Sequence, residues 1–250
     1  MRITFITLFP ELVKPWLEFG PPRAASDAGS LQVRFLNPKH YARTPKDTDD
    51  YPFGGGPGMV LRPEPLIRAI TDATDDEGGL VLVASARGRV LCQDWIKELA
   101  SQPHLVIVCG RYKDIDERVL RWADGEFSVG NLVVSGGEGP GVILLDAIAR
   151  LLPGALGDQD SARDDSFEGG LLGHPSYTKP REYLGLSVPG VLVSGDHRAI
   201  ANWRRRQALL YTLRQRPDLL ARKGLGSGEM KLLRESLKEE KNRGRPDKGP

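Results

Sequence analysis

Three short apolar runs in the first two thirds of the chain each lead into a glycine-containing turn. The runs at residues 80–84, 105–109 and 131–134 have the length and apolar character of buried strands. Glycine after a strand lets the backbone turn sharply and leaves peptide N–H and C=O groups uncovered for a ligand. In an open α/β sheet, ligands bind at the carboxyl ends of the strands. The pattern therefore predicts a small-molecule pocket held mostly by backbone groups.

The first 153 residues alternate between strand-like and helix-like patterns. Two further strand-like runs lie at residues 2–9 and 31–36. Helix-like runs are found at residues 10–19, 62–73, 93–100, 114–122 and 142–152. Alternating strands and helices are typical of an α/β domain whose sheet is mainly parallel. We therefore expect residues 1–153 to form one such domain.

The character of the chain changes at Pro153. Residues 154–173 are polar, acidic and rich in glycine, which predicts a mobile linker or lid. Residues 174–241 hold the helical patterns of a small, all-helical second domain. Residues 242–250 combine basic charge with glycine and proline, and we expect a disordered tail.

Charge is distributed unevenly along the chain. Residues 1–197 hold 20 Lys and Arg against 27 Asp and Glu, a net charge of −7. Residues 198–250 hold 15 against 6, a net charge of +9. A basic end on an acidic body favours a partner with a phosphate backbone. The alternative is a solvated helix surface followed by a disordered tail.

Several common kinds of site lack their signature. The sequence has no P-loop, no G-x-G-x-x-G fingerprint and no G-x-S-x-G turn. The four histidines and two cysteines lack metal-ligand spacing, so we expect no metal site built on them. No apolar run is long enough for a membrane span and no signal-peptide pattern is present. We therefore expect a cytoplasmic protein without a membrane partner.

Three features allow both a structural and a functional interpretation. Arg150 ends an apolar helix, where it either lays its stem on the core or directs its charge at a developing anion. Asp165 either caps a short turn or acts as a general base. The residues alone favour the structural interpretation of both. The glycine-rich run at 53–59 is either a tight turn or, with Tyr51 and Phe53, a surface for a flat base.

A series of motifs in a fixed order carries a family resemblance. The motifs are FP at 9–10, GGGPGM at 54–59, CGRY at 109–112, IDER at 115–118, VSGGE at 134–138, RLLPG at 150–154, DSF at 165–167, GLL at 170–172, PSYTKP at 175–180, VP at 188–189, LVSGDH at 192–197 and WR at 203–204. Together they resemble the bacterial tRNA (guanine-N(1))-methyltransferases of the SPOUT class, over about residues 1–220.

The resemblance implies a mainly parallel α/β domain with a deep trefoil knot and a small helical C-terminal domain. It also implies a homodimer whose active site is shared between the chains. S-adenosylmethionine would bind in the loops of the knot, at the pocket that the glycine turns predict. The implied cofactor-binding residues are Ser85, Ala86, Gly88, Cys109, Gly110, Arg111, Tyr112, Ser128, Val129, Gly130, Leu132, Ser135, Gly136 and Gly137.

The implied reaction is methylation of N-1 of the guanosine just 3′ of the anticodon, position 37 of tRNA. By the same resemblance, Asp165 is the general base and Arg150 stabilises charge on the guanine oxygen, which reverses the structural interpretation of both. The implied residues for binding the tRNA anticodon stem-loop are Gly55, Gly56, Pro57, Ser166, Phe167, His174, Tyr177, His197, Arg198, Trp203, Arg204 and Arg205. Two alternatives stay open: a SPOUT methyltransferase acting on another RNA site, and a non-enzymatic RNA-binding module.

Three positions depart from the family pattern. Lys113 replaces a glutamate, which argues against the magnesium that the resemblance would otherwise imply, unless Asp114 takes over that role. Asn131 replaces an aspartate and removes one charge. Gly173 replaces a common acidic residue before His174, so we expect the tRNA contacts there to differ.

Overall fold

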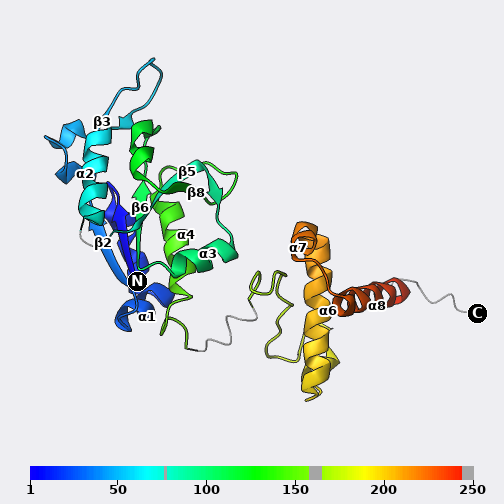
Figure 1. The fold of residues 1–250 in the computed structure, drawn as a ribbon. Helices are drawn as coiled ribbons and strands as arrows, with labels where there is room; N and C mark the ends of the chain where they lie inside the picture. The colour runs from blue at the N-terminus through cyan, green and yellow to red at the C-terminus, as the bar shows by residue number, and fades with distance from the viewer. Residues whose placement is uncertain (76–77, 158–164, 244–250) are drawn as a thin grey trace, which may run out of the picture. The chain divides into compact units, whose positions relative to one another are not determined.

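The computed structural model describes residues 1–75, 78–157 and 165–243 (Figure 1). The chain forms two compact units, Met1–Gly157 and Asp158–Pro250. None of the helices in the described residues is long and apolar enough to cross a membrane.

The first unit is built on a five-stranded sheet in which every neighbouring pair of strands is parallel. The strand order is β2 (Gln32–Leu36), β1 (Arg2–Ile6), β6 (His104–Cys109), β5 (Leu80–Val90) and β8 (Gly125–Ser128). The predicted α/β class with a mainly parallel sheet is therefore confirmed. The central strand β6 is buried along its whole length, as is typical of a parallel strand covered on both faces.

Helices cover both faces of this sheet (Figure 1). They are η1 (Pro10–Leu12), η2 (Lys14–Glu18), α1 (Gly20–Asp27), η3 (Pro38–His40), η4 (Pro45–Thr48), α2 (Pro63–Thr74), α3 (Gln93–Ala100), η5 (Glu117–Trp122) and α4 (Glu138–Ala149). Alternate residues of β6 serve the two faces, since Leu105 belongs to one apolar cluster with Leu144 of α4 and Val106 to another with Leu66 of α2. Helices and apolar side chains thus cover both faces of the sheet. A ligand can therefore reach the sheet only at the ends of its strands.

A small second sheet fixes the base of the glycine-rich loop at residues 51–59. Its strands are β3 (Asp49–Asp50), β4 (Val60–Leu61) and β7 (Asp114–Ile115). The loop connects the antiparallel strands β3 and β4, and β4 also pairs in parallel with β7. The loop is thereby attached to the segment that follows β6.

Three sequence predictions in the first unit are wrong in detail. Residues 131–134 form no strand: they pair with no other strand, and Val133 is 99% exposed rather than buried in a sheet. The turn predicted at 85–88 lies inside β5, which continues past a register shift against β8. The helix predicted at 114–122 starts later, because β7 comes first and Asp116 caps η5.

The helix predicted at 10–19 is also interrupted. Two short 3₁₀ helices, η1 and η2, occupy most of this stretch, and α1 follows them. Pro15 lies at the start of η2. Its ring removes the backbone N–H that a continuous helix would need there.

The second unit consists of helices and one small hairpin. Its elements are β9 (Glu182–Tyr183), β10 (Leu186–Ser187), η6 (Gly190–Val193), α6 (His197–Gln215), α7 (Pro217–Lys223) and α8 (Ser227–Arg243). The antiparallel pair β9–β10 was not predicted. The core is small and contains Leu171, Ala208, Leu209, Leu210 and Leu233.

The predicted linker or lid is described only in part. Residues 158–164 lie outside the described residues. Nearer α6, Leu171 is buried, and the backbone N–H of Leu172 donates to Oγ1 of Thr212 over 2.9 Å. This end of the segment therefore belongs to the core of the second unit, and its role as a lid stays a prediction. Of the predicted tail, residues 244–250 lie outside the described residues.

Candidate functional site

A pocket of about 270 Å³ lies where β6 and β8 end and beside residues 84–87 within β5, at the edge of the sheet that the sequence predicts. Three segments line it, at residues 84–87, 110–114 and 127–137, with Pro140 of α4. Twelve of the predicted cofactor-binding residues are in the lining: Ser85, Ala86, Gly110, Arg111, Tyr112, Ser128, Val129, Gly130, Leu132, Ser135, Gly136 and Gly137. The structure thus brings these residues together, and cofactor binding by them stays a prediction.

Two predicted cofactor-binding residues, Cys109 and Gly88, do not line the pocket. Cys109 is 1% exposed, and burial, reinforced by the nearby charge of Glu138, raises the pKa of its thiol well above the usual value. Gly88 packs on β8, where an added Cβ would lie 2.4 Å from the backbone nitrogen of Phe127. Both residues pack against the strands that carry the lining, Cys109 as a buried residue of β6 and Gly88 against β8.

The glycines at 136 and 137 are required by close packing. A Cβ on Gly137 would lie 2.6 Å from Cα of Cys109, and one on Gly136 would lie 2.5 Å from Nε of Arg111. Real Cβ contacts are never so short, so these positions exclude any side chain. The N–H of Gly137 donates to the carbonyl of Gly110 over 2.9 Å, which joins two of the three lining segments.

A buried ion pair supports this wall. Nε of Arg111 lies 2.8 Å from Oε2 of Glu138, and the Glu138 side chain is only 2% exposed. The hydroxyl of Thr7 donates to the other carboxylate oxygen over 2.6 Å. The guanidinium of Arg111 also lies 4.7 Å from the ring centre of Phe9. The charge of Arg111 is therefore matched inside the protein, and its side chain fixes the lining loop.

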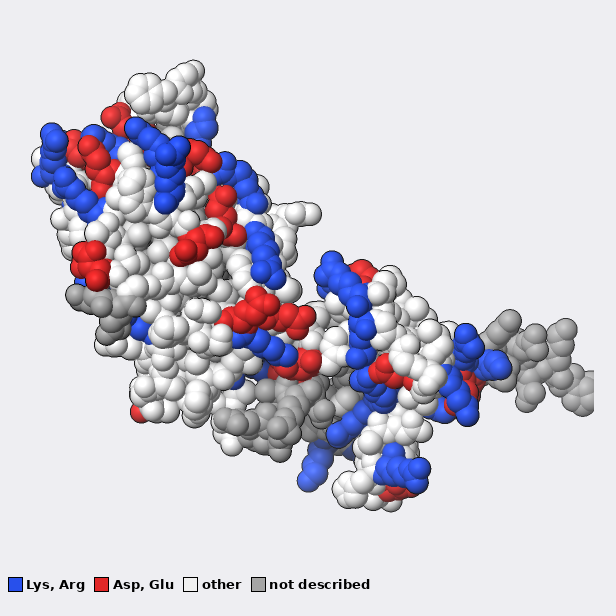
Figure 2. Space-filling model, viewed as in Figure 1, with Lys and Arg blue, Asp and Glu red and all other residues white. Residues whose placement is uncertain are grey.

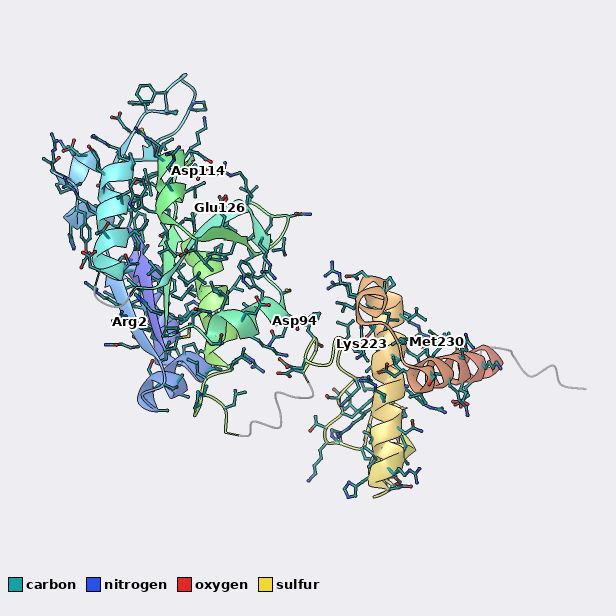
Figure 3. All side chains as sticks on the ribbon, viewed as in Figure 1. Arg2, Asp94, Asp114, Glu126, Lys223 and Met230 are labelled. Atoms are coloured by element: carbon teal, nitrogen blue, oxygen red, sulfur yellow. The ribbon has the colours of Figure 1, made fainter. Side chains whose placement is uncertain are left out.

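Residues beyond the predicted set also line the pocket. They are Ala84, Arg87, Lys113, Asp114, Phe127, Val133, Val134 and Pro140. The guanidinium of Arg87 lies 3.0 Å from Glu117 and 3.4 Å from Glu126, and the hydrogen bond to Glu117 raises the pKa of Arg87. Asp114 and Glu126 mark this part of the first unit in Figure 3. The signal that could have found Lys113 and Asp114 is their position in the turn directly after β6.

The predicted tRNA-binding residues of the glycine-rich loop lie beside the same region. Gly55 and Gly56 have φ of 77° and 106°, in the range that favours glycine. An added Cβ on Gly56 would lie 3.4 Å from Nζ of Lys113, a pocket residue. Gly55, Gly56 and Pro57 are all exposed.

Arg150 does not reach this pocket in its own chain. It caps the carboxyl end of α4, whereas the pocket lies at the amino end of that helix. At 1.5 Å per residue the helix separates Gly137 from Arg150 by about 20 Å. An arginine side chain cannot cover this distance, so the predicted catalytic arginine and the pocket of one chain are apart.

The second unit holds the other predicted site residues. A hollow of about 450 Å³ is lined by Asp165, His174, His197, Arg204 and Arg205, among others. A second hollow, of about 580 Å³, is lined by His174, Tyr177 and Arg204 with further residues. Lys and Arg side chains form several separate patches on the visible face of this unit, with Asp and Glu side chains among them (Figure 2).

The remaining predicted residues of this unit lie on α6 and on the segment before it. The ring of Trp203 lies 6.3 Å from that of Tyr177, centre to centre. Oγ of Ser166 accepts from the N–H of Gly173 over 2.9 Å, and Phe167 has a positive φ of 77°. Arg198 is exposed near the start of α6 and lines neither hollow.

Magnesium finds little support in the side chains present. Within residues 1–75, 78–157 and 165–243, no three His, Cys, Asp or Glu side chains group as they would around a metal ion. At the pocket, the one carboxylate in the lining is that of Asp114, and the ammonium of Lys113 is its neighbour in sequence. Magnesium prefers carboxylate and water oxygens, and an adjacent ammonium opposes a cation, so these residues fit it poorly.

Fold and pocket together define a class: an α/β protein with a small-molecule-sized pocket at the carboxyl edge of a parallel sheet. The family model described as "tRNA (Guanine-1)-methyltransferase TrmD" matches residues 1–222. The chain belongs to this family and is a methyltransferase.

Relatives over the full length agree with the family match. A tRNA (guanine-N(1)-)-methyltransferase of Moorella thermoacetica is 44% identical, over 97% of this chain and 99% of its own. One of Pseudomonas putida KT2440 is 46% identical, over 96% and 97%. One of Staphylococcus epidermidis is 42% identical, over 97% and 100%.

Proposed function

We propose that this enzyme transfers a methyl group from S-adenosylmethionine to N-1 of the guanosine just 3′ of the anticodon, position 37 of tRNA. The observation that carries the proposal is the glycine-containing pocket at the carboxyl edge of the sheet. Its family and the names of its relatives supply the substrate, the guanine of a tRNA.

The residues of the pocket suit an adenosine-containing donor. The lining holds peptide groups of Gly110, Gly130, Gly136 and Gly137, which can hydrogen-bond a base and a ribose, and apolar side chains such as Phe127. S-adenosylmethionine, when bound, would supply an electrophilic methyl group. We also propose the trefoil knot here, and its support is that the loop at 135–137 passes close to two strands, with Gly137 packed against Ala84 of β5 and Cys109 at the end of β6.

The chain's own residues would activate the guanine. N-1 of guanine carries a proton and is a poor nucleophile until that proton leaves. The carboxylate of Asp165 would accept this proton. The guanidinium of Arg150 would stabilise the negative charge that then develops on the guanine oxygen, a role typically worth about 2.7–4 kcal/mol. The pocket would contribute positioning rather than covalent chemistry.

We propose that two chains share each active site. Arg150 lies about 20 Å from the pocket along α4 of its own chain, so a pocket that uses Arg150 needs it from a partner. Apolar side chains near the pocket support a homodimer, because Val133 is 99% exposed, Leu132 51% and Ile143 of α4 53%. Burial of these side chains against a second copy would stabilise such a dimer.

The basic surface of the second unit would hold the anticodon stem-loop. Arg198, Arg204 and Arg205 would contact phosphates, and such contacts position an RNA without identifying its sequence. Trp203 and Tyr177, whose rings lie close together, would offer flat faces to unpaired bases. Guanine must leave its stack to react, and this costs less in a loop than in a duplex.

Product mapping tests the reaction. The full chain is incubated with a tRNA transcript that carries guanosine at position 37 and with isotopically labelled S-adenosylmethionine, and the methylated nucleotide is located by mass spectrometry. We expect one methyl group at N-1 of that guanosine and none on a transcript with adenosine there. Methylation of another nucleotide would support the alternative of a SPOUT enzyme with a different target.

A mixed dimer tests the shared site. Asp165→Asn and Gly137→Val each leave a chain without one essential part. In a shared arrangement, a dimer of the two variants keeps one complete site out of two and regains about half the activity per dimer. A mixed dimer with no more activity than either parent would show that each site belongs to a single chain.

A further inference from the structure

The lining of the pocket carries more positive than negative side chains. Among the described residues that line it, Arg87, Arg111 and Lys113 are cationic, and Asp114 is the one carboxylate. The donor proposed for this pocket is itself a cation at sulfur, because a sulfonium carries a positive charge. Like charges repel each other more strongly in a partly enclosed site than in bulk water. Carboxylates close behind the lining should therefore decide whether such a donor is accepted.

Three carboxylates outside the lining pair with its two arginines. Arg87 lies 3.0 Å from Glu117 and 3.4 Å from Glu126, and the side chain of Arg87 is 53% exposed, so solvent screens this group. Nε of Arg111 lies 2.8 Å from Oε2 of Glu138, and these side chains are only 16% and 2% exposed. Water screens a pair in such a position much less. Glu138 is therefore the carboxylate whose charge the pocket should feel most.

Glu138 is held beside Arg111 by contacts from the end of β1. The hydroxyl of Thr7, a fully buried residue, donates to Oε1 of Glu138 over 2.6 Å. The same hydroxyl accepts from the N–H of Phe9 over 2.9 Å, which leaves its own proton for the carboxylate. Glu138 is also the first residue of α4, where the partial positive charge of a helix N-terminus favours a carboxylate. The position of this negative charge is thus fixed by three neighbours.

We propose that Glu138, held by Thr7, compensates the charge of Arg111 and thereby allows the pocket to accept the sulfonium of S-adenosylmethionine. The inference rests on the proposed function, because it takes that molecule as the ligand of the pocket. Glu138 does not line the pocket, so it is a positioning residue that acts through Arg111. Its role concerns the charge of the ligand as well as its shape.

The alternative is that Glu138 only packs the wall. Gly136 lies against both partners, since an added Cβ would be 2.5 Å from Nε of Arg111 and 2.8 Å from Oε2 of Glu138. A loss of packing would weaken every ligand of the pocket by a similar factor. The loss of a compensating charge would weaken a cation more than a neutral ligand of nearly the same shape. One ratio of affinities therefore distinguishes the two explanations.

Two ligands that differ in charge at sulfur test the proposal. S-adenosylmethionine carries a sulfonium, and S-adenosylhomocysteine lacks one methyl group and has a neutral thioether in its place. Affinities of both are measured by calorimetry for the full-length chain and for Glu138→Gln, without tRNA so that no methyl transfer occurs. Glutamine has nearly the same size and keeps an oxygen that can accept from Thr7.

The charge variants should change the ratio of the two affinities. We expect Glu138→Gln to bind S-adenosylmethionine about tenfold more weakly and S-adenosylhomocysteine about twofold more weakly, a change of about fivefold in the ratio. The double variant of Glu138→Gln with Arg111→Gln removes both charges and should return the ratio to its original value.

Two buried threonines of the same strand region give a matched pair. Thr7→Val releases Glu138 without removing a charge, so it should change the ratio in the same direction by about threefold. Thr7→Ser should restore it. Thr4→Val also removes a buried hydrogen bond, because Oγ1 of Thr4 lies 2.9 Å from Nε2 of His104 at the start of β6. This bond is at the opposite end of the strand from the pocket, so Thr4→Val should leave the ratio unchanged.

Other outcomes would overturn the inference. Equal losses for the two ligands in Glu138→Gln would show that Glu138 only packs the wall. A double variant whose ratio stays changed would show that Glu138 does not act through the charge of Arg111. Urea unfolding establishes that each variant is folded, and if Glu138→Gln is not, an unchanged ratio in Thr7→Val decides against the proposal. If the unaltered chain binds neither ligand, the proposed function itself fails, which is a separate result.

Discussion

The pocket of the first unit and the hollows of the second differ in the kinds of residues that line them. The wall of the pocket contains several glycines and is closely packed, and a methyl group on Gly137 would lie 2.6 Å from Cα of Cys109. The hollows are formed mainly by side chains of α6 and the segment before it, including Asp165 and Arg204, over a small apolar core. A ligand held by backbone depends on shape and close packing, whereas one held by exposed charges depends on charge and salt. Substitutions in the two regions should therefore fail in different ways.

The largest expected effect separates chemistry from cofactor binding. Asp165→Asn removes the proposed base from the second unit and should lower kcat by about 10²- to 10⁴-fold. The affinity for S-adenosylhomocysteine should stay within twofold, because the pocket of the first unit contains no part of this residue. Single-turnover methylation and calorimetry give the two numbers. A parallel loss of affinity would mean that Asp165 is structural, as its sequence context alone suggests.

The next effect tests the role of close packing. A methyl group on Gly137 would overlap Cα of Cys109, and overpacking of this kind costs about 1–3 kcal/mol. Gly137→Ala should therefore weaken S-adenosylhomocysteine binding more than tenfold and lower the free energy of unfolding. Gly139→Ala is the matched control, since nothing lies within 4 Å of a Cβ there and alanine favours the helix. If the two variants behave alike, shape does not control the pocket.

The glycine turns made this pocket predictable from the sequence. An apolar run followed by glycine marked the end of β6 and, within β5, the segment that lines the pocket, and the alternation of patterns predicted the parallel sheet. Local patterns failed where the deciding contact is not local. Residues 131–134 have the composition of a strand, yet Val133 is exposed. The prediction failed because composition cannot distinguish a buried strand from an apolar loop that a second chain would cover.

The separation of Arg150 from the pocket could not be predicted from the sequence either. The sequence showed an arginine at the end of an apolar helix, but its distance from the pocket follows from which end of α4 faces the sheet edge. The roles of Arg150 and Asp165 came from the resemblance alone, since their local contexts favoured a structural interpretation. Lys113 and Asp114 were visible as departures from a pattern, and only the structure places both in the lining.

A smaller effect should appear in tRNA binding. Arg204 lines both hollows of the second unit, so Arg204→Ala should weaken tRNA binding about fivefold at low salt and reduce the slope of log affinity against log salt by about one. Arg206 is the matched control, because it lines neither hollow and its guanidinium lies 2.8 Å from Glu239. Filter binding over a salt series compares the two variants. An unchanged slope for Arg204→Ala would remove it from the RNA interface.

The smallest functional effect is expected at a charged contact that lies in neither region. The hydroxyl of Tyr41 donates to Asp72, which also pairs with Arg34. The hydrogen bond from Tyr41 lowers the pKa of Asp72, while burial and the same hydrogen bond raise the pKa of Tyr41 to about 12. Tyr41→Phe should leave methyl transfer and tRNA affinity unchanged and lower the free energy of unfolding by about 0.5–1.5 kcal/mol at pH 7.

The pH dependence of that difference gives the sharper test. The pKa of Asp72 is depressed in the folded chain, so its stabilisation is present above the unfolded pKa of about 3.9 and is lost as the pH falls through the folded value. The pKa of Tyr41 is raised, so its stabilisation is present below about pH 10 and is lost as the pH rises toward 12. Urea unfolding of both proteins should therefore show the largest difference between about pH 4 and 10. A difference that does not vary with pH would mean that Tyr41 stabilises by packing alone.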